Sequence, residues 1–510
     1  MEWKPIITPA KLETLHSFFP RLRSNLHARI VLTVLKRIER FLGYPIGINL
    51  PIDTEPFHNN PESLRALRLM IKLKKEKFLK SFYFDVHDYA DEPTGHVTVA
   101  RLEDIDRLGF SGKGADMFDK AKTLWPTLGE AIERYAIYFF YPKKGDYRDS
   151  SYDELPEPKV DIFSIAGFDN VLRSGKHDSF ILEYDRDTSF RWIKSLELTE
   201  QKETWAPLQW FSFSHLRQYS HKATAINDSG TFEPLLGPSI TTGVATGQSL
   251  SDATFRGLLE VIERDAFIIY WLNQITPERI DTSTFHHEGI NEMVKIAKRY
   301  HLELHVLYLK TDVPVHTVCT LLIDRSGIGP ALTLGTKTTT TLFEAVYGSM
   351  SDVLSQRGVF RKMMDDPEYQ PHKSIDLKAI GHLERMHYWF SVDKLPYIDW
   401  LIGGKTISAA SLPIYSYAPD VQDALAELLK FFAEKRYRVY AKELLNEKLR
   451  NLTEGLSVVM VRVPQLQPLS LEESLSTLGG ERLYEIPQYL GHTPKKDRDQ
   501  FFMDVPHPFP

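Results

Sequence analysis

LGEAIERYA at residues 128–136 and LLEVIERDA at residues 258–266 are two nearly identical stretches around which this chain is organised. Six of their nine positions carry the same residue. In each copy two glutamates lie three residues apart, with no proline or glycine between them. On a helix this spacing places both carboxylates on one face. The repeat therefore predicts a duplicated helix, related by a rough two-fold axis, that carries paired acids.

If the two helices face each other, four carboxylates converge. Anionic groups gathered in one cleft repel each other unless cations lie between them. Oxygen ligands of this kind suit Mg²⁺, which proteins usually bind together with phosphate oxygens. The repeat thus predicts a magnesium–nucleotide site. A single copy would more often be a solvated helix face with Glu–Arg pairs, and the second copy is what favours the site.

A glycine-rich stretch, ITTGVATGQS at residues 240–249, leads directly into the second copy. Ser249 and Asp252 resemble a capping box, with Asp in place of the usual Glu, and predict a helix that continues to about residue 273. A glycine-rich loop that feeds a helix N-terminus can bind an anion. We therefore interpret this stretch as one lip of the nucleotide site, with an ordinary helix cap as the alternative.

Composition places the chain among ordinary water-soluble globular proteins. It has 510 residues, 42% of them hydrophobic and 25% charged, and a net charge of −6. This charge supports neither a nucleic-acid partner nor an anionic membrane surface. The single cysteine, Cys319, lies in a pattern typical of a buried strand and excludes internal disulfides. The first residues lack a signal-peptide pattern and no apolar run is long enough to span a membrane, so we expect a cytoplasmic protein.

The pattern divides the chain at about residue 95. Residues 1–95 are expected to form a helical N-terminal appendage and a candidate docking region, and 96–510 the main domain. A glycine-containing loop at 111–115 should precede a helical run from 115 to 141. Later patterns predict further strands and helices. Strands are expected at 97–102, 302–309, 315–323, 331–335 and 456–463, and helices at 342–357 and 420–450.

The chain ends Pro506-His507-Pro508-Phe509-Pro510. Alternate prolines fix φ and favour an extended polyproline-II tail. Such a tail is stiff, so its insertion into a cleft costs little further conformational entropy. A frayed terminus is the common alternative.

Taken together, these stretches resemble the YcaO family over residues 105–510. The matching motifs are SGKG (111–114), LGEAIERY (128–135), GVATGQSL (243–250), GLLEVIERDA (257–266), LG (334–335), the helix end at 352–357, GLSVV (455–459) and PQLQPL (464–469). The resemblance implies an α/β (α+β) fold that binds ATP, with Mg²⁺ held around the triphosphate.

Carried over by position, the resemblance assigns the site residues. The Mg²⁺ ligands would be Glu130, Glu133, Glu260 and Glu263, and the nucleotide pocket would be lined by Ala245, Gln248 and Asp252. Arg264 and Arg357 would reach phosphates, which the arginine fork binds bidentately. The chain departs from the family where Pro126 replaces the usual Ser and where Asp252 replaces a common Glu.

The proline-rich tail resembles the branch of the family that makes azolines. These enzymes cyclise Cys, Ser or Thr side chains of a ribosomal precursor peptide onto the preceding amide. ATP phosphorylates the amide oxygen so that it leaves as phosphate. The position of the tail makes His507 and the Pro510 carboxylate candidate catalytic groups, with His507 more often a bystander.

The resemblance also implies partners. Azoline-forming members usually act with a peptide-clamp protein, for which residues 1–95 are too short, and a flavin dehydrogenase accompanies azole production. Homodimers are common in the family. Two other functions stay open: thioamide or amidine formation on the same fold, which the proline tail disfavours, and a nucleotide-binding scaffold without catalysis, which the intact glutamate pairs disfavour.

Overall fold

The computed structural model describes residues 61–509 with gaps. The gaps are 86–88, 104–110, 168–183, 214–224, 227–231, 238–239, 367–379, 381, 454, 472–476, 496–497 and 504. The chain divides into two compact units, Met1–Asn59 and Asn60–Pro510, and the described helices and strands all belong to the second unit. The predictions made for residues 1–60 and for Pro510 lie outside the described residues. In the described part, no helix combines the length and apolar character needed to cross a bilayer.

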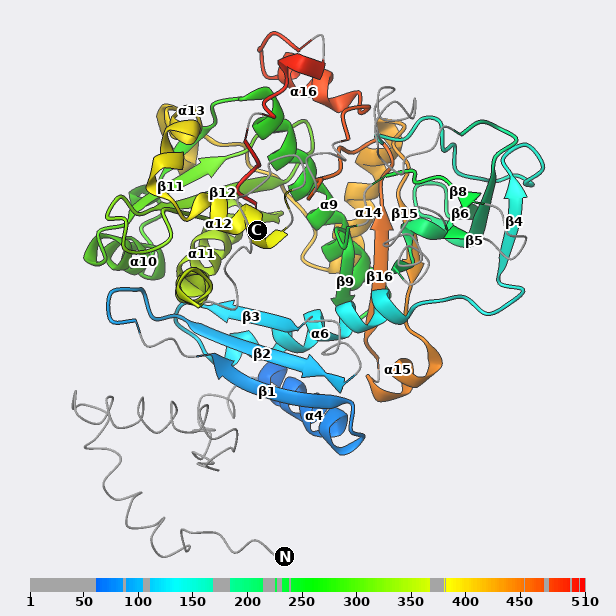
Figure 1. Ribbon diagram of the computed structural model, residues 1–510, viewed down its shortest axis with the longest axis horizontal. Helices are drawn as coiled ribbons and strands as arrows, with labels where there is room; N and C mark the ends of the chain where they lie inside the picture. Colours follow the sequence, from blue (N-terminus) through cyan, green and yellow to red (C-terminus); the bar gives the residue numbers. More distant parts are fainter. Residues whose placement is uncertain are drawn as a thin grey trace, which may run out of the picture. The chain divides into compact units, whose positions relative to one another are not determined.

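The first layer is a three-stranded antiparallel sheet, and the helices α4 (Pro61–Lys75) and α6 (Leu124–Phe139) lie against it (Figure 1). Helix α4 is followed by β1 (Leu79–Asp85), β2 (His96–Leu102) and β3 (Gly112–Asp116). The chain leaves the helix at Lys77, which adopts a left-handed φ of 56°. The domain boundary expected near residue 95 falls between β1 and β2, inside this sheet, because the two strands share a ladder of backbone hydrogen bonds. The loop expected at 111–115 is the strand β3.

Two larger sheets complete the fold. One has the order β4-β5-β15-β16-β9 with β6 paired to β5, and the other the order β13-β12-β11-β10-β14. The first comprises β4 (Tyr147–Ser151), β5 (Ser189–Glu197), β6 (Lys202–Pro207), β9 (Val244–Gly247), β15 (Tyr440–Glu443) and β16 (Ser457–Arg462). The second comprises β10 (Glu278–Asp281), β11 (Glu303–Tyr308), β12 (His316–Ile323), β13 (Leu332–Thr339) and β14 (Thr406–Ser408). A short pair, β7 (Ala225–Ile226) with β8 (Phe232–Glu233), forms a separate sheet.

The helices are α6 (Leu124–Phe139), α9 (Leu250–Asn273), α10 (Glu288–Arg299), α11 (Leu342–Asp365), α12 (His382–Trp389), α13 (Asp399–Ile402), α14 (Val421–Glu434), α15 (Glu447–Leu452) and α16 (Arg482–Tyr489). The mixture of helices and mostly antiparallel sheets, in which only β10 and β14 pair in parallel among the described strands, confirms the α+β class. The prediction of a single helix at 420–450 is wrong. Arg436 adopts a left-handed φ of 60° after α14 ends, and Val439 and Tyr440 then enter the buried strand β15.

Helix α9 is the central element of the molecule (Figure 1). Ser249 caps it by accepting the backbone N–H of Asp252, as the sequence predicted. Every residue from Asp265 to Asn273 is buried, so the second half of the helix packs into the core on all sides. The first half packs against α14 and β16. Its glutamates are thus presented from a rigid support.

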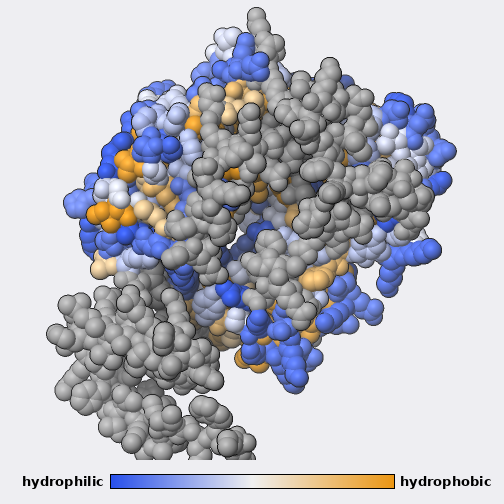
Figure 2. Space-filling view, in the orientation of Figure 1, coloured by the Kyte–Doolittle hydropathy of each residue, from blue (hydrophilic) through white to orange (hydrophobic). Residues whose placement is uncertain are grey.

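Hydrophilic side chains cover most of the described surface on the face shown in Figure 2. Hydrophobic side chains appear there as separate spots among them. The most exposed large hydrophobic residues, Ile414 and Ile71, belong to different parts of the chain. Single exposed apolar residues of this kind are normal on a protein surface. The apolar side chains that matter for the site are therefore the ones buried around α9.

Three strand–helix units share one close packing arrangement: β3 with α6, β9 with α9, and β13 with α11. In each unit a glycine at or beside the strand lies against a helix residue that directly follows an acid. These acids are Glu130 in α6, Glu260 in α9 and Asp352 in α11. A Cβ on Gly112 would meet Ala131 at 2.3 Å, one on Gly243 would meet Val261 at 3.0 Å, and one on Gly335 would meet Val353 at 3.2 Å. These three glycines allow the close approach of each helix to its strand. The repeat seen in the sequence therefore has a third member.

Candidate active site

Helices α6 and α9 meet through the strand β9. The backbone N–H of Thr246 donates to Glu133 Oε1 at 2.6 Å, and the Thr246 hydroxyl donates to the carbonyl of Gly129 at 3.1 Å. The strand that leads into the second glutamate helix is therefore bonded to the first. The structure brings the two copies of the repeat together, on neighbouring elements.

The first glutamate of each copy is held in the same way. Lys113 N–H donates to Glu130 Oε2 at 2.7 Å, and Gly243 N–H donates to Glu260 Oε2 at 3.1 Å. Both donors lie 17 residues before their acceptor. The equal spacing shows that the duplication extends to this hydrogen bond. In each copy the backbone donor holds the carboxylate in place without neutralising its charge.

An arginine one turn later completes each copy. Arg134 Nη2 lies 3.1 Å from Glu130 Oε1, and Arg264 Nη2 lies 3.2 Å from Glu260 Oε1. Arg264 also contacts Glu263 through Nη1. The arginines stay partly accessible, with 28% of the Arg134 side chain and 17% of the Arg264 side chain exposed. They can therefore serve both as partners of the glutamates and as donors to an anion.

A fifth carboxylate enters the cluster from the third unit. Asp352 of α11 lies 17 residues after Gly335 of β13, the same interval as that between Gly243 and Glu260. It interacts electrostatically with Glu263 and Glu130. Glu263 in turn accepts a 2.6 Å hydrogen bond from the Thr336 hydroxyl of β13. The cluster is thus built from α6, α9 and α11 together.

Burial raises the pKa values of three acids of the cluster, Glu133, Glu260 and Asp352. Burial raises the pKa of Glu133 to about 7, opposed by the Thr246 N–H and reinforced by the charges of Glu130 and Glu260. Burial also raises the pKa values of Glu260 and Asp352, against attraction from Arg264 and Lys337 respectively. These three acids are easier to protonate than a solvated carboxyl group because burial disfavours their charged forms. The cluster is suited to a bound cation.

The donor set fits Mg²⁺ only together with phosphate oxygens. In the described part of the chain, no three His, Cys, Asp or Glu side chains lie close enough to hold a metal by themselves. Mg²⁺ keeps several waters and is commonly bound by one or two carboxylates plus substrate phosphates. The arrangement of glutamates on opposed helices agrees with that mode rather than with a preformed protein cage.

The residues expected to line the nucleotide pocket lie at the start of α9. Ala245 is buried in β9. The N–H of Gln248 donates to Asp252 Oδ2 at 2.9 Å, and Asp252 Oδ1 accepts Arg256 Nε at 2.7 Å. The side-chain oxygen of Gln248 accepts a 2.7 Å bond from Arg65 of α4. The N-terminal helix therefore reaches one edge of the expected pocket.

Arg357 is placed differently from the expectation. Its side chain is fully buried, and Nε, Nη1 and Nη2 bond to Glu92, the carbonyl of Pro330 and Asp324. All three guanidinium nitrogens are thus engaged in a structural network. Reaching a phosphate would require that this network open.

The C-terminal tail lies inside the molecule. His507 is 1% exposed: Phe509 N–H donates to its Nδ1 at 3.3 Å, and Nε2 lies 2.7 Å from the carbonyl of Ser470. Both bonds are satisfied by the neutral tautomer with hydrogen on Nε2. The Phe509 ring lies 4.2 Å from the guanidinium carbon of Arg264. His507 thus acts as an internal brace that brings Phe509 to the cluster, and Pro510 lies beyond the described residues.

Sequence reasoning missed four residues of this site. Asp352 could have been found from its spacing after Gly335. Thr246, Thr336 and Arg65 carry no local signal, since each bonds to a residue at least 73 positions away.

Comparison with known proteins places this geometry in a family. A family model described as YcaO cyclodehydratase, ATP- and Mg²⁺-binding, matches residues 111–467. A curated relative, an uncharacterised protein of Methanothermobacter thermautotrophicus, is 26% identical over 173 residues, which cover 32% of this chain and 45% of the relative.

Three solved structures share the fold at low sequence identity. A heterocyclase in complex with substrate and cofactor has a TM-score of 0.67 at 16% identity, over 86% of this chain and 57% of that one. YcaO from Methanopyrus kandleri, bound with AMPPCP and Mg²⁺, has a TM-score of 0.56 at 16% identity, over 82% of this chain and 94% of that one. The E. coli microcin synthetase McbBCD complex with pro-MccB17 bound has a TM-score of 0.51 at 16% identity, over 75% of this chain and 87% of that one.

The chain spans less than half of the curated relative and a little over half of the first of these structures. The family model covers well over half of the chain, from the start of β3 to the segment after β16. The expected resemblance is confirmed: this chain belongs to the YcaO family.

Proposed function

We propose that this chain is an ATP- and Mg²⁺-dependent cyclodehydratase subunit that converts Cys, Ser or Thr residues of a ribosomal precursor peptide into azolines. The observation that carries the proposal is the cluster of Glu130, Glu133, Glu260, Glu263 and Asp352, with the Phe509 ring on Arg264 beside it. The first feature supports a metal–nucleotide site. The second supports a tail that forms part of the reaction chamber.

The reaction consumes ATP because an amide oxygen is a poor leaving group. The side-chain thiol or hydroxyl adds to the preceding amide carbon and loses its proton to a base, so the carbonyl oxygen becomes an oxyanion. That oxygen takes the γ-phosphoryl group of ATP and ADP leaves. The carbon–oxygen bond then breaks, phosphate departs, and the ring nitrogen loses its proton. The net change is loss of one water from the peptide and hydrolysis of one ATP.

The residues of this chain would act by holding and neutralising charge. The glutamates would hold Mg²⁺, which when bound offsets the charge of the triphosphate. Arg134 and Arg264 would donate to phosphate oxygens, because they remain partly exposed beside the glutamates. Gln248 and Asp252 would line the nucleotide at the start of α9. Because burial raises the pKa of Glu133 to about 7, this acid is partly protonated at neutral pH in the empty site, and a bound cation would favour its ionised form.

A partner protein is part of the proposal. One of the structurally similar proteins is a multi-protein microcin synthetase with a peptide bound. This chain covers only 57% of the heterocyclase that is solved with substrate. We infer that a separate peptide-clamp protein presents the precursor peptide to this chain, with a flavin dehydrogenase following it where azoles are made.

The test is phosphate release from ATP with a Cys-containing peptide encoded beside this chain, with and without a co-encoded clamp protein. The expected product has lost the mass of one water per ring, and Glu260→Gln should abolish both signals. Exchange of oxygen for sulfur would favour thioamide formation instead. Nucleotide binding without phosphate release or peptide modification would favour a scaffold subunit.

A further inference from the structure

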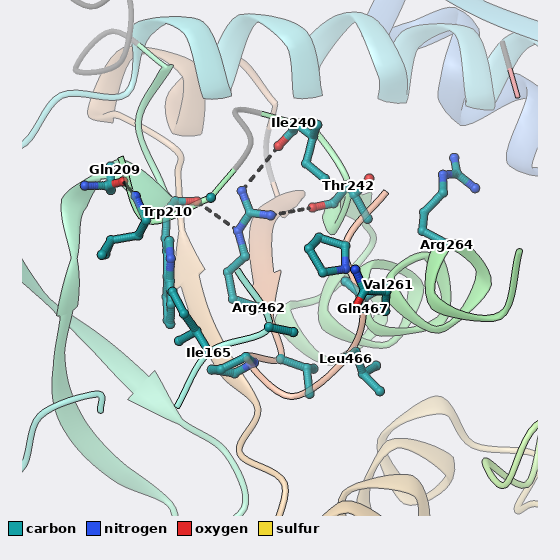
Figure 3. A pocket seen from close by; sticks show the side chains of 16 residues that line it. Ile165, Gln209, Trp210, Ile240, Thr242, Val261, Arg264, Arg462, Leu466 and Gln467 are labelled. Atoms are coloured by element: carbon teal, nitrogen blue, oxygen red, sulfur yellow. Dashed lines mark hydrogen bonds between the residues drawn. The ribbon is translucent and has the colours of Figure 1, made fainter. Parts of the chain in front are cut away.

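A pocket of about 700 Å³, counting its open mouth, adjoins the carboxylate cluster (Figure 3). Its walls are mainly apolar and come from segments that precede β9, from α9 and from the segment after β16. They include Ile165, Trp210, Leu236, Ile240, Val261 and Leu466. Arg264 lines the pocket and also pairs with Glu260, so the pocket and the cluster share a side chain.

Arg462 is a cation that lines this pocket (Figure 3). Its guanidinium is held by the carbonyls of Trp210 at 3.2 Å, Ile240 at 3.2 Å and Thr242 at 3.4 Å. In the described part of the chain no carboxylate forms an ion pair with it. A guanidinium has five N–H donors, so these bonds leave donors free. Burial lowers the pKa of Arg462 to about 10, with an opposing effect of Glu260, and the group stays charged at neutral pH.

Arg264 connects the pocket to the cluster. It lines the pocket and also pairs with Glu260 and Glu263. Phe509 of the tail lies over the same guanidinium. Figure 3 shows the two guanidinium groups apart, with that of Arg264 turned away from Arg462. A molecule in the pocket would therefore have apolar walls and the Arg462 guanidinium around it, and Arg264 would lie between it and the carboxylate cluster.

We propose that this pocket receives the apolar side chain of the substrate residue that precedes the cyclised residue, with the carbonyl oxygen of that residue directed to Arg462. This inference rests on the proposed function. That oxygen becomes negative when the thiol or hydroxyl adds to its carbon, and preorganised cationic donors stabilise such a developing charge. Apolar walls with a few convergent polar groups are typical of a small ligand site. The substrate class is a peptide with an apolar residue, of the size of Leu or Phe, directly before Cys, Ser or Thr.

The first test uses the full chain with its co-encoded clamp protein and a peptide with a photoreactive benzoylphenylalanine directly before cysteine. Irradiation in the presence of ADP and Mg²⁺ should give cross-links to Trp210, Leu236 or Ile240, mapped by mass spectrometry. The same peptide with Leu in place of the photoreactive residue should compete, and inorganic phosphate should not. Cross-links elsewhere, no specific cross-link, or equal competition by phosphate would overturn the proposal.

The second test uses kinetics with three peptides that differ only in having Gly, Leu or Phe before cysteine. Leu236→Trp, which fills the pocket, should raise KM at least tenfold for the Leu and Phe peptides and leave the Gly peptide within twofold. Arg462→Gln should lower kcat at least tenfold for all three without changing the dissociation constant of ATP. Arg438→Gln, on a partly exposed arginine outside the pocket, is the matched control.

The two proposals fail in different ways. If the unaltered chain, with its partner, dehydrates none of the peptides, the proposed function fails. If it dehydrates them and Leu236→Trp affects the three peptides equally or not at all, only the pocket inference fails.

Discussion

Glu130 and Glu260 are the residues through which the duplication acts. Each accepts a backbone N–H from the strand side and an arginine from one turn later. This arrangement holds the carboxylates in place and leaves lone pairs available. The consequence at the residue scale is a group of acids whose mutual repulsion is relieved only when a cation binds.

Asp352 gives the sharpest test of that repulsion. Burial dominates the raised pKa of Asp352, and Glu263 and Glu130 raise it further. Asp352→Asn should therefore stabilise the empty protein, raising Tm by about 1–2 °C. It should also weaken binding of Mg²⁺–ATP about tenfold, or about 1.4 kcal/mol, because a negative group near the metal is lost.

Differential scanning fluorimetry with and without Mg²⁺–ATP, together with titration calorimetry, measures both effects. Glu292→Gln on the exposed face of α10 is the control and should change neither quantity. A variant that is destabilised when empty and unchanged in nucleotide affinity would assign Asp352 a purely structural role.

Glu133 predicts a pH dependence with a defined sign. Its pKa in the folded protein, about 7, lies above the ordinary value of 4.5. The favourable contribution of the protonated acid is fully present below about pH 4.5 and is lost as the pH rises through about 7. One pKa unit corresponds to about 1.4 kcal/mol, and Glu133 is only half-buried by surface area. We therefore expect a loss of about 1–2 kcal/mol of unfolding free energy between these pH values.

Urea denaturation of the nucleotide-free protein at pH 5, 6, 7 and 8 tests this sign. Glu133→Gln should flatten the pH dependence, whereas Glu292→Gln should retain it. A stability that rises over this range, with no effect of Glu133→Gln, would contradict the assignment.

The residues of the site divide clearly into those that the sequence could predict and those that it could not. The four glutamates were predictable because an i, i+3 pair repeats with its flanking apolar positions. Asp352 was hidden because its unit has Asp and Ser where the others have two Glu. Arg357 matched a motif by position, but burial with Glu92 and Asp324 depends on contacts across 265 and 33 residues that no local pattern reports.

At the scale of elements, α4 is the least expected part of the site. It lies outside the residues that the family model matches, yet Arg65 bonds to Gln248 and lies 5.8 Å from the Trp125 ring. Arg65→Ala should weaken ATP binding about three- to fivefold, because an exposed charged hydrogen bond contributes roughly 0.5–1 kcal/mol. The bond orients the amide group of Gln248 at the edge of the nucleotide pocket.

Equilibrium binding of a fluorescent ATP analogue measures this effect. Arg68→Ala, one turn later on an exposed position of α4, is the control and should bind as the parent does. Equal weakening by both variants would indicate a general electrostatic effect of the helix rather than a specific contact with Gln248.

The tail is the second element with a defined role. Trp389 and Arg385 of α12 donate to the carbonyls of Pro506 and His507, and Phe509 packs on Phe267 with ring centroids 5.1 Å apart. Phe509→Ala should lower the rate of peptide dehydration at least tenfold and leave ATP affinity within twofold, because the ring covers the Arg264 guanidinium beside the glutamates. Phe509→Leu keeps apolar bulk without the ring, so its rate of peptide dehydration should lie between those of the unaltered chain and Phe509→Ala.

Rates of water loss by mass spectrometry and ATP affinity by calorimetry separate these effects. Tyr489→Ala, an exposed aromatic at the end of α16, is the control. A parallel loss of dehydration and ATP affinity in Phe509→Ala would mean that the tail supports the nucleotide site rather than the peptide side.

At the scale of the whole molecule, the fold is organised by three strand–helix units that meet at the carboxylates. The sequence predicted the two glutamate helices and the α+β class, because a local repeat and apolar periodicity report neighbours along the chain. It did not predict which strands pair, because partners such as β5 and β15 lie far apart in the sequence. For the same reason it placed the domain boundary at residue 95, inside a sheet whose pairing is non-local.

This difference in boundary leads to opposite expectations for two truncations. Removal of residues 1–59 leaves the compact unit Asn60–Pro510 complete. It should therefore keep Tm within about 2 °C and ATP affinity within twofold.

Removal of residues 1–95 deletes α4 and β1. It exposes the edge of β2 and removes the buried side chains of Leu73, Phe78 and Leu79 from the core. Burying such a side chain contributes about 1.5–3 kcal/mol, so this variant should aggregate or unfold more than 10 °C earlier. Thermal melts and size-exclusion chromatography of the two truncated chains measure this. Equal stability of the two would mean that β2 and β3 need no partner strand and that the independent unit begins after residue 95.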